Sequence, residues 1–109
     1  MQAFSLQREF RRLKRAFRCF GLRFPADVRV QWSWEVDEDG NLGEWSELER
    51  VIRINSALRR WPVVVSLVLI HEMCHAYCDT YFPERSAHGK RWRTLMRVLA
   101  VRGVFDRLW

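Results

Sequence analysis

The sequence predicts one α+β domain, in which a helix comes first, a small sheet follows and two further helices end the chain. Residues 4–20 repeat apolar side chains with a helical period. Residues 28–36 alternate between apolar and polar side chains, as a half-buried strand does, and residues 63–70 form a dense apolar run. A chain of 109 residues has room for one hydrophobic core, so we expect a single domain over residues 1–109.

The first predicted element is a helix over residues 4–20. Its apolar side chains fall on one stripe, formed by Leu6, Phe10, Leu13, Phe17 and Phe20. Arginines lie off that stripe, and a glycine at position 21 suits the end of the helix. This segment is amphipathic and lacks the apolar centre of a signal peptide, and the run 63–70 is too short to span a bilayer. We therefore expect a cytoplasmic protein with no membrane partner.

A small, three-stranded and mostly antiparallel sheet is expected next. The first strand covers residues 28–36, with the residues from Val28 to Val36 at even positions on one face. A turn centred on Asp39 and Gly40 leads to strands over residues 43–48 and 50–55. We expect the strand over 50–55 to form an edge of the sheet, where an extended substrate could pair.

Two helices complete the predicted fold. Pro62 suits the first position of a long, buried helix that runs to about residue 79. The final helix covers residues 88–102, and its inner stripe holds Trp92, Leu95, Met96 and Leu99. The three cysteines are odd in number and accompany no secretion signal. We therefore interpret Cys74 and Cys78 as small buried thiols rather than as members of a disulfide framework.

The long helix carries the motif His71-Glu72-Met73-Cys74-His75, which has the pattern H-E-x-x-H. Residues four apart lie one turn apart on the same helix face, so both imidazoles can reach one zinc ion. Glu72 projects about a quarter-turn away, beside the metal. Zinc (Zn2+) lowers the pKa of a water towards neutrality, and the carboxylate can then take its proton as a general base.

A catalytic zinc needs a third protein ligand, and the sequence offers three candidates. His88 is preferred, because twelve residues separate it from His75 and all three histidines of the chain then serve one site. Glu84 is chemically acceptable, although it stands next to Pro83 in a predicted loop. Cys78 shares the helix face of His71, but one straight helix rarely supplies every ligand.

Charge is unevenly distributed along a chain whose formal net charge is +6. The two ends are basic, whereas residues 35–49 hold seven acids and no base. Arginine outnumbers lysine seventeen to two, and guanidinium groups suit phosphate contacts. DNA bound through an Arg-rich surface is therefore a candidate partner.

Residues 50–97 resemble the SprT-like (Spartan) zinc metallopeptidase family. The matching residues are Arg53-Ile54-Asn55 with Leu58, Leu69 through Tyr77, His88-Gly89 with Trp92, and Met96. The resemblance implies a zincin-like minimal metallopeptidase fold, in which a helix and a small sheet precede the H-E-x-x-H helix and a closing helix. It supports His88 as the third zinc ligand. It also implies a protein or peptide substrate, and family members include proteases that degrade proteins crosslinked to DNA.

The preferred function is therefore a zinc-dependent metalloendopeptidase, with Glu72 as catalytic residue and with His71, His75 and His88 as metal ligands. Two alternatives remain: a DNA-binding module with a structural zinc, and a scaffold protein with little or no catalysis. Coordination distinguishes the DNA-binding module from the peptidase, because a structural site is closed by four protein ligands whereas a catalytic site keeps an open position. Stoichiometric metal without any turnover on casein or DNA-bound protein would indicate the scaffold.

Overall fold

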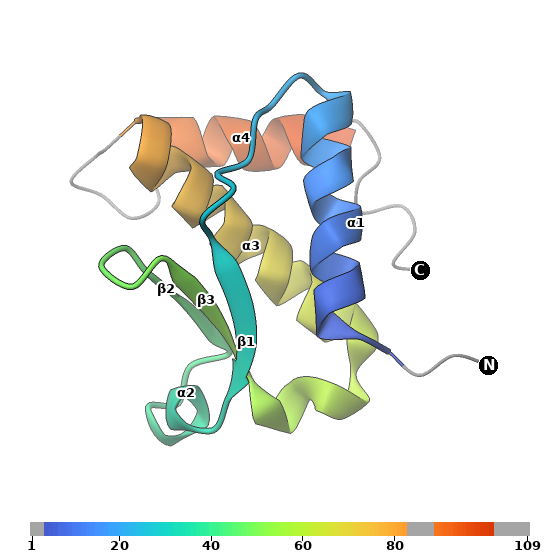
Figure 1. Ribbon diagram of the computed structural model, residues 1–109, viewed down its shortest axis with the longest axis vertical. Coiled ribbons are helices and arrows are strands. Elements are labelled where there is room, and N and C mark those ends of the chain that lie inside the picture. The colour runs from blue at the N-terminus through green and yellow to red at the C-terminus, as the bar shows by residue number, and fades with distance from the viewer. Residues whose placement is uncertain (1–3, 83–88, 102–109) are drawn as a thin grey trace.

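The computed structural model describes residues 4–82 and 89–101 and has an α+β architecture (Figure 1). Helix α1 (Leu6–Cys19) comes before strand β1 (Arg29–Ser33), and the short helix α2 (Glu35–Glu38) separates β1 from strands β2 (Gly43–Ser46) and β3 (Val51–Asn55). A 3₁₀ turn (Ser56–Arg60) leads into the long helix α3 (Pro62–Tyr81), and α4 (Lys90–Val101) follows. This confirms the predicted fold class, and the order of elements is compatible with a minimal zincin-like fold.

Helix α1 begins two residues later than predicted and packs as its sequence predicts. The Ser5 hydroxyl oxygen accepts a hydrogen bond from the Arg8 amide at 3.2 Å, which satisfies one of the amides exposed at the helix start. The predicted stripe is buried except at its last member, Phe20, which is half-buried. Gly21 follows with φ of +75°, a left-handed conformation that a glycine adopts at little cost.

The sheet is mixed rather than mostly antiparallel. Its strand order is β1-β3-β2, with β1 parallel to β3 and β2 antiparallel to β3. The tight turn after β2 makes the antiparallel pair, and β1 then occupies the other side of β3. Strand β3 is therefore central, and the expectation that residues 50–55 form a sheet edge is wrong: β2 and β1 are the edges.

The first strand is shorter than the alternation over residues 28–36 predicts. The Ser33 hydroxyl accepts a hydrogen bond from the Val36 amide at 3.4 Å, and the chain turns into α2. The helical turn brings Val36 back into the protein, where it is 1% exposed, but leaves Trp34 63% exposed. The alternation of apolar and polar residues therefore predicted the burial of Val36 correctly, but it assigned this residue to a strand and not to a helical turn.

One core joins the two layers. Buried side chains of α1, β1, β3 and α3 meet between the helices and the sheet, and α4 adds Leu95 and Leu99 at one end. The first half of α3 supplies much of this core, although Val63 in its first turn is exposed. No helix among residues 4–82 and 89–101 is both long enough and apolar enough to cross a membrane.

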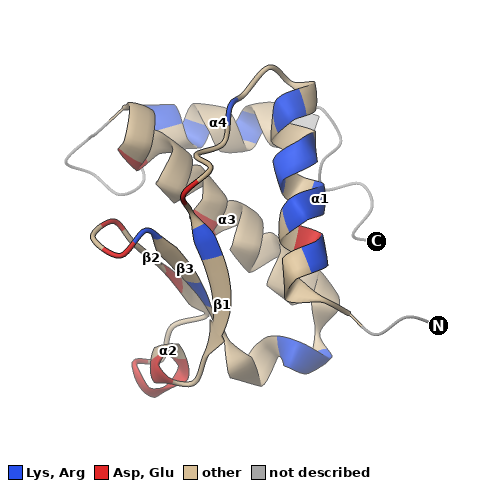
Figure 2. Cartoon of the chain, in the orientation of Figure 1, with Lys and Arg blue, Asp and Glu red and all other residues tan. Residues whose placement is uncertain are grey.

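Charged side chains are segregated on this framework (Figure 2). Lysine and arginine are spread along α1 and α4, whereas aspartate and glutamate gather on α2 and near the turn between β2 and β3. The uneven charge of the sequence therefore becomes a difference between two sides of the molecule.

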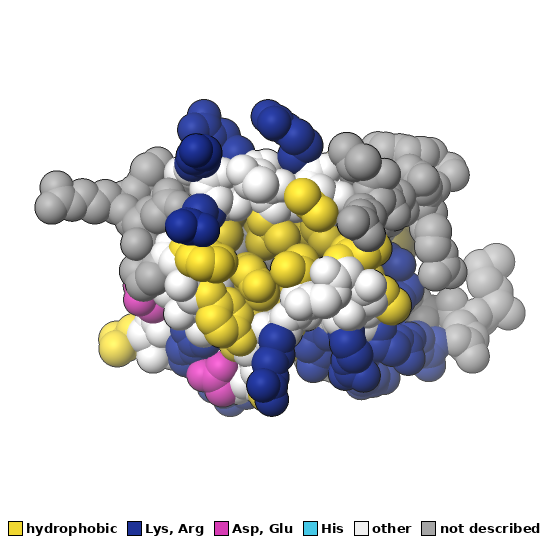
Figure 3. All heavy atoms as spheres, turned by 90° about the horizontal axis from the view of Figure 1, so that it is seen from above, with side chains coloured by type: hydrophobic (Ala, Val, Ile, Leu, Met, Phe, Trp, Pro, Cys, Tyr) yellow, Lys and Arg dark blue, Asp and Glu magenta, His cyan; other side chains and the backbone are white. Residues whose placement is uncertain are grey.

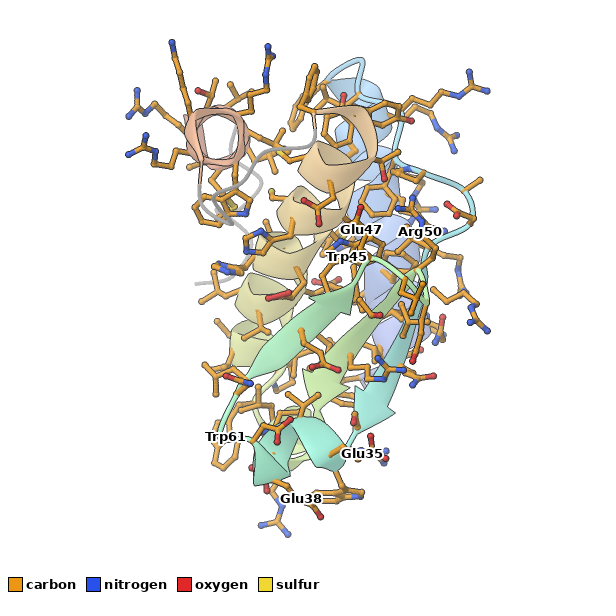
Figure 4. All side chains as sticks on the ribbon, turned by 90° about the vertical axis from the view of Figure 1, so that its left-hand side faces the viewer. Glu35, Glu38, Trp45, Glu47, Arg50 and Trp61 are labelled. Atoms are coloured by element: carbon orange, nitrogen blue, oxygen red, sulfur yellow. The ribbon has the colours of Figure 1, made fainter. Side chains whose placement is uncertain are left out.

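The β2–β3 turn is fastened to the C-terminal half of α3. The Trp45 indole N–H donates to Asp79 Oδ2 at 2.7 Å, and Arg50 donates to Thr80 Oγ1 at 2.7 Å and to Asp27 Oδ2 at 2.9 Å. Figure 4 shows Trp45 and Arg50 together at this end of the sheet, where the guanidinium lies 5.0 Å from the indole ring centre. These contacts hold Arg50 at a φ of +58°, which is uncommon for a non-glycine residue.

Candidate metal centre

Helix α3 brings His71 and His75 together on one face. Their Nε2 atoms lie 3.1 Å apart, and the ring centres are 4.8 Å apart. Two nitrogens that bind one zinc ion at about 2.0–2.1 Å with a tetrahedral angle would lie about 3.3–3.4 Å apart. The two rings are thus aimed at a common point at nearly the spacing that one metal ion requires.

Glu72 projects from the adjacent face of α3 and is 7% exposed. Its Oε1 lies 3.9 Å from His71 Nε2, and ligand atoms of His71, Glu72 and His75 all lie within 4.8 Å of one another. Burial, together with a smaller effect of the negative charge of Glu44, raises the pKa of the Glu72 carboxyl to about 7. A bound cation would act in the opposite direction, because it favours the charged carboxylate.

Strand β2 forms the wall of the cleft beside Glu72. The cleft has a volume of about 370 Å³, and its lining includes Leu42, Gly43, Val68, His71 and Glu72. A Cβ atom on Gly43 would lie 2.6 Å from Val68 Cγ1 and 3.5 Å from Glu72 Cγ. Only glycine permits this close approach of strand and helix, so Gly43 determines how near the sheet edge comes to the carboxylate.

Helix α4 covers the histidines from the other side. The Trp92 ring stacks on the His75 ring, with centres 5.2 Å apart and an angle of 22° between the planes. It also meets the His71 ring at 4.9 Å, and its indole N–H donates to the His71 carbonyl oxygen at 3.4 Å. One aromatic side chain therefore contacts both histidines and restricts their orientation.

The residues present fit a divalent metal. Two imidazoles and a carboxylate are a donor set that suits zinc and other first-row transition metals. Among the described residues, His71, Glu72 and His75 form a group that could hold a metal ion. The half-exposed histidines stand beside an open cleft, so the group is accessible from solvent.

A model of the SprT-like family matches residues 6–105. The chain belongs to the SprT-like family. No curated protein and no solved structure matches this chain. The family match also extends over α1, β1 and β2, which precede the residues 50–97 that carry the sequence resemblance.

Only part of the predicted site of this SprT-like protein falls on described residues. The structure brings His71, Glu72 and His75 together. Both His88 and Glu84 lie outside the described residues, so the choice between them stays a prediction. Cys78 is buried at 8% exposure, and it is not in the group that could hold a metal among the described residues.

Two features of the site were missed by sequence reasoning. Gly43 carries a recognisable signal, since a glycine inside a predicted strand often marks a close backbone approach. The contact of Trp92 with both histidines had a weaker signal, because its place on the inner stripe of the last helix indicated burial without indicating a partner.

Proposed function

We propose that this chain is a zinc-dependent endopeptidase. The observation that carries the proposal is the juxtaposition of two imidazole Nε2 atoms 3.1 Å apart with a buried carboxylate beside them, at an open cleft. Membership of the SprT-like family supports the same reading. A purely structural metal site would have no use for the buried Glu72, whereas a hydrolytic site needs a base at that place.

The proposed roles follow from position. His71 and His75 hold the zinc, and His88 is proposed as the third ligand because it directly precedes the segment whose Trp92 packs on both imidazoles. When bound, zinc would supply a Lewis acid that polarises the scissile carbonyl and makes water more acidic. Glu72 takes a proton from the attacking water and delivers it to the leaving amine.

The substrate is proposed to lie along the edge strand β2. This strand pairs with β3 on one side only, and its first residue, Gly43, lines the cleft with Glu72. An extended peptide could add to the edge through main-chain hydrogen bonds, which would place a peptide bond near the carboxylate. The expected partner is accordingly an extended segment of a protein or peptide.

DNA-associated proteins are the proposed substrate class. A cavity of about 670 Å³ lies along α1 and the loop after it, and its five charged lining residues are all basic: Arg11, Lys14, Arg15, Arg18 and Arg23. Basic side chains one turn apart can follow a phosphate backbone. DNA held by these basic side chains would bring the proteins bound to it to this chain, in agreement with a substrate that is associated with or crosslinked to DNA.

The function is tested with Glu72→Gln. The variant should keep stoichiometric zinc and lose at least a hundredfold of its activity on casein, because the amide cannot accept the proton. Zinc content is measured by elemental analysis alongside proteolysis, with and without single-stranded DNA. Equal cleavage by parent and variant would remove Glu72 from catalysis. Metal without any turnover in the parent would favour the scaffold or DNA-module alternative.

A comparison of two variants tests which residue is the third zinc ligand. His88→Ala should weaken zinc binding at least tenfold, while Glu84→Ala should leave it within twofold. A competition titration against a chromogenic chelator measures both. The opposite pattern would assign the ligand role to the carboxylate.

A further inference from the structure

A third concave surface lies at the C-terminal end of α3, just beyond the histidines in the sequence. This cavity of about 580 Å³, here called the α3–α4 groove, lies between the end of α1, the last turns of α3 and one face of α4. Its apolar floor is built by Phe20, Leu22, Tyr77, Phe82, Leu95 and Val98. Trp92 and the metal-site residues are not part of its lining, so the proposed catalysis does not account for it.

Two large apolar residues of the groove floor are exposed to solvent. Phe82 is 37% exposed and Val98 is 38% exposed. Figure 3 looks onto this side of the molecule and shows apolar side chains gathered at its centre, with lysine and arginine on two sides. A contiguous apolar patch with a polar rim is a typical sign of a protein-binding site.

The charged residues at the rim of the groove are basic, so they favour an acidic ligand. Lys90 and Arg91 line the groove, and no aspartate or glutamate does so among the described residues. Leu22 also lines the basic cavity of α1, so Arg18 and Arg23 adjoin the groove on its opposite side. A ligand on the apolar floor would thus meet cations along both of its flanks.

Nucleic acid is a poorer match for this floor than for the basic cavity of α1. Bases bind single-strand grooves by stacking on open aromatic faces. The Arg91 guanidinium already lies 4.2 Å from the Phe82 ring centre, and the Tyr77 ring packs against Tyr81 at 4.8 Å and Phe82 at 6.4 Å. The remaining floor consists of Phe20 and three aliphatic residues, Leu22, Leu95 and Val98, and this mostly aliphatic surface suits the aliphatic side chains of a peptide.

We infer that the α3–α4 groove docks an amphipathic helical segment of a partner protein, with apolar side chains on one face and acidic side chains along its flanks. Such segments lay an apolar face into a groove through residues spaced i, i+3, i+4 and i+7. The inference goes beyond the proposed peptidase function and does not depend on it.

The test uses a fluorescein-labelled synthetic helix with leucines on one face and glutamates on its flanks, and a matched peptide with lysines in place of the glutamates. Fluorescence anisotropy with the full chain should show saturable micromolar binding of the acidic peptide and at least tenfold weaker binding of the basic one. Mass spectrometry after each titration establishes that the peptide is intact. Absence of saturable binding of the acidic peptide would overturn the inference.

Two variants localise the binding. Val98→Glu should weaken the acidic peptide at least tenfold, whereas Val63→Glu, an equally exposed valine in the first turn of α3, should change it less than twofold. Replacing Lys90 and Arg91 together by glutamate should reverse the preference towards the basic peptide. Circular dichroism checks that each variant is folded.

The remaining outcomes decide against the inference. Equal effects of the two valine substitutions would place the peptide elsewhere on the protein. A single-stranded oligodeoxynucleotide that displaced the peptide, and whose own binding fell with Val98→Glu, would assign the groove to nucleic acid instead.

Discussion

Replacing Gly43 by alanine tests the close approach of β2 to α3 on which the cleft depends. The added Cβ would lie 2.6 Å from Val68 Cγ1 and 3.2 Å from the Arg53 carbonyl oxygen. Carbon atoms in ordinary contact are about 3.5–4.0 Å apart, so strand or side chain must move by about 1 Å. Neither partner yields easily, because a helical valine strongly prefers one χ1 rotamer and the carbonyl belongs to the paired strand β3.

The expected loss of stability follows from two opposing effects. Inserting a methyl group into a filled space typically costs about 1–3 kcal/mol. Alanine in place of a glycine within a strand would otherwise gain about 0.5–1 kcal/mol, because the unfolded chain loses less freedom on folding. We therefore expect Gly43→Ala to lower the free energy of unfolding by about 1–2 kcal/mol, and to disturb peptidase activity because the same strand lies against Glu72.

Urea unfolding of the metal-free protein measures this loss, and Val68→Ala supplies the internal check. In that background the closer of the two contacts, with Val68 Cγ1, is removed and only the one with the Arg53 carbonyl oxygen remains, so Gly43→Ala should cost at least about 1 kcal/mol less than in the parent. Gly21→Ala is the matched control: its φ of +75° makes alanine unfavourable although no atom lies within 4 Å of the new Cβ. Its cost should be additive with that of Val68→Ala. An unchanged or higher stability of Gly43→Ala would refute the packing argument.

Three further predictions concern other contacts. Trp92→Leu should weaken zinc binding about tenfold in a chelator competition while Trp92→Phe loses less, because only the phenyl ring can still stack on His75. Asp27→Asn should make the free energy of unfolding, measured with urea, less dependent on pH in the acid range. The hydrogen bond from Arg50 lowers the pKa of Asp27. The stabilisation by the Asp27 carboxylate is therefore present above the ordinary pKa of 3.8 and is lost as the pH falls through the lowered pKa. Cys19 should be the one thiol that reacts rapidly with a disulfide reagent in the native protein, and Cys19→Ser should remove that fast phase.

The helices were predictable because their signals are local. An apolar stripe with a serine before it determines α1, and a proline at the first position of an apolar segment determines the start of α3. Strand pairing was less predictable, because the neighbour of β3 on each side depends on how the whole chain packs. The alternation through Val36 was mistaken for one strand. The Val36 amide donates a hydrogen bond to the Ser33 hydroxyl oxygen where the chain turns, and the alternation of apolar and polar residues does not reveal this turn.

At the candidate site, the sequence predicts the arrangement of residues that lie on the same helix. It does not predict the contacts that other elements make with them. The spacing of His71 and His75 is a property of the α-helix, so their juxtaposition followed from four-residue separation alone. The burial of Glu72 depends on β2, whose approach is controlled by Gly43, and the ordering of the histidine rings depends on α4. Those contacts join residues that are 17 or more positions apart in the sequence, and no local pattern encodes such contacts.

Helix α4 contacts both the candidate metal centre and the α3–α4 groove. One face presents Trp92 to the histidines, and another presents Arg91 and Val98 to the α3–α4 groove. A helix is stiff, so a ligand that fixes one face also limits the motion of the other. Docking in the groove would therefore be expected to hold the indole on His75 and to slow loss of the metal. If peptide binding left the zinc dissociation rate unchanged, the groove would be a tether for partners with no effect on the centre.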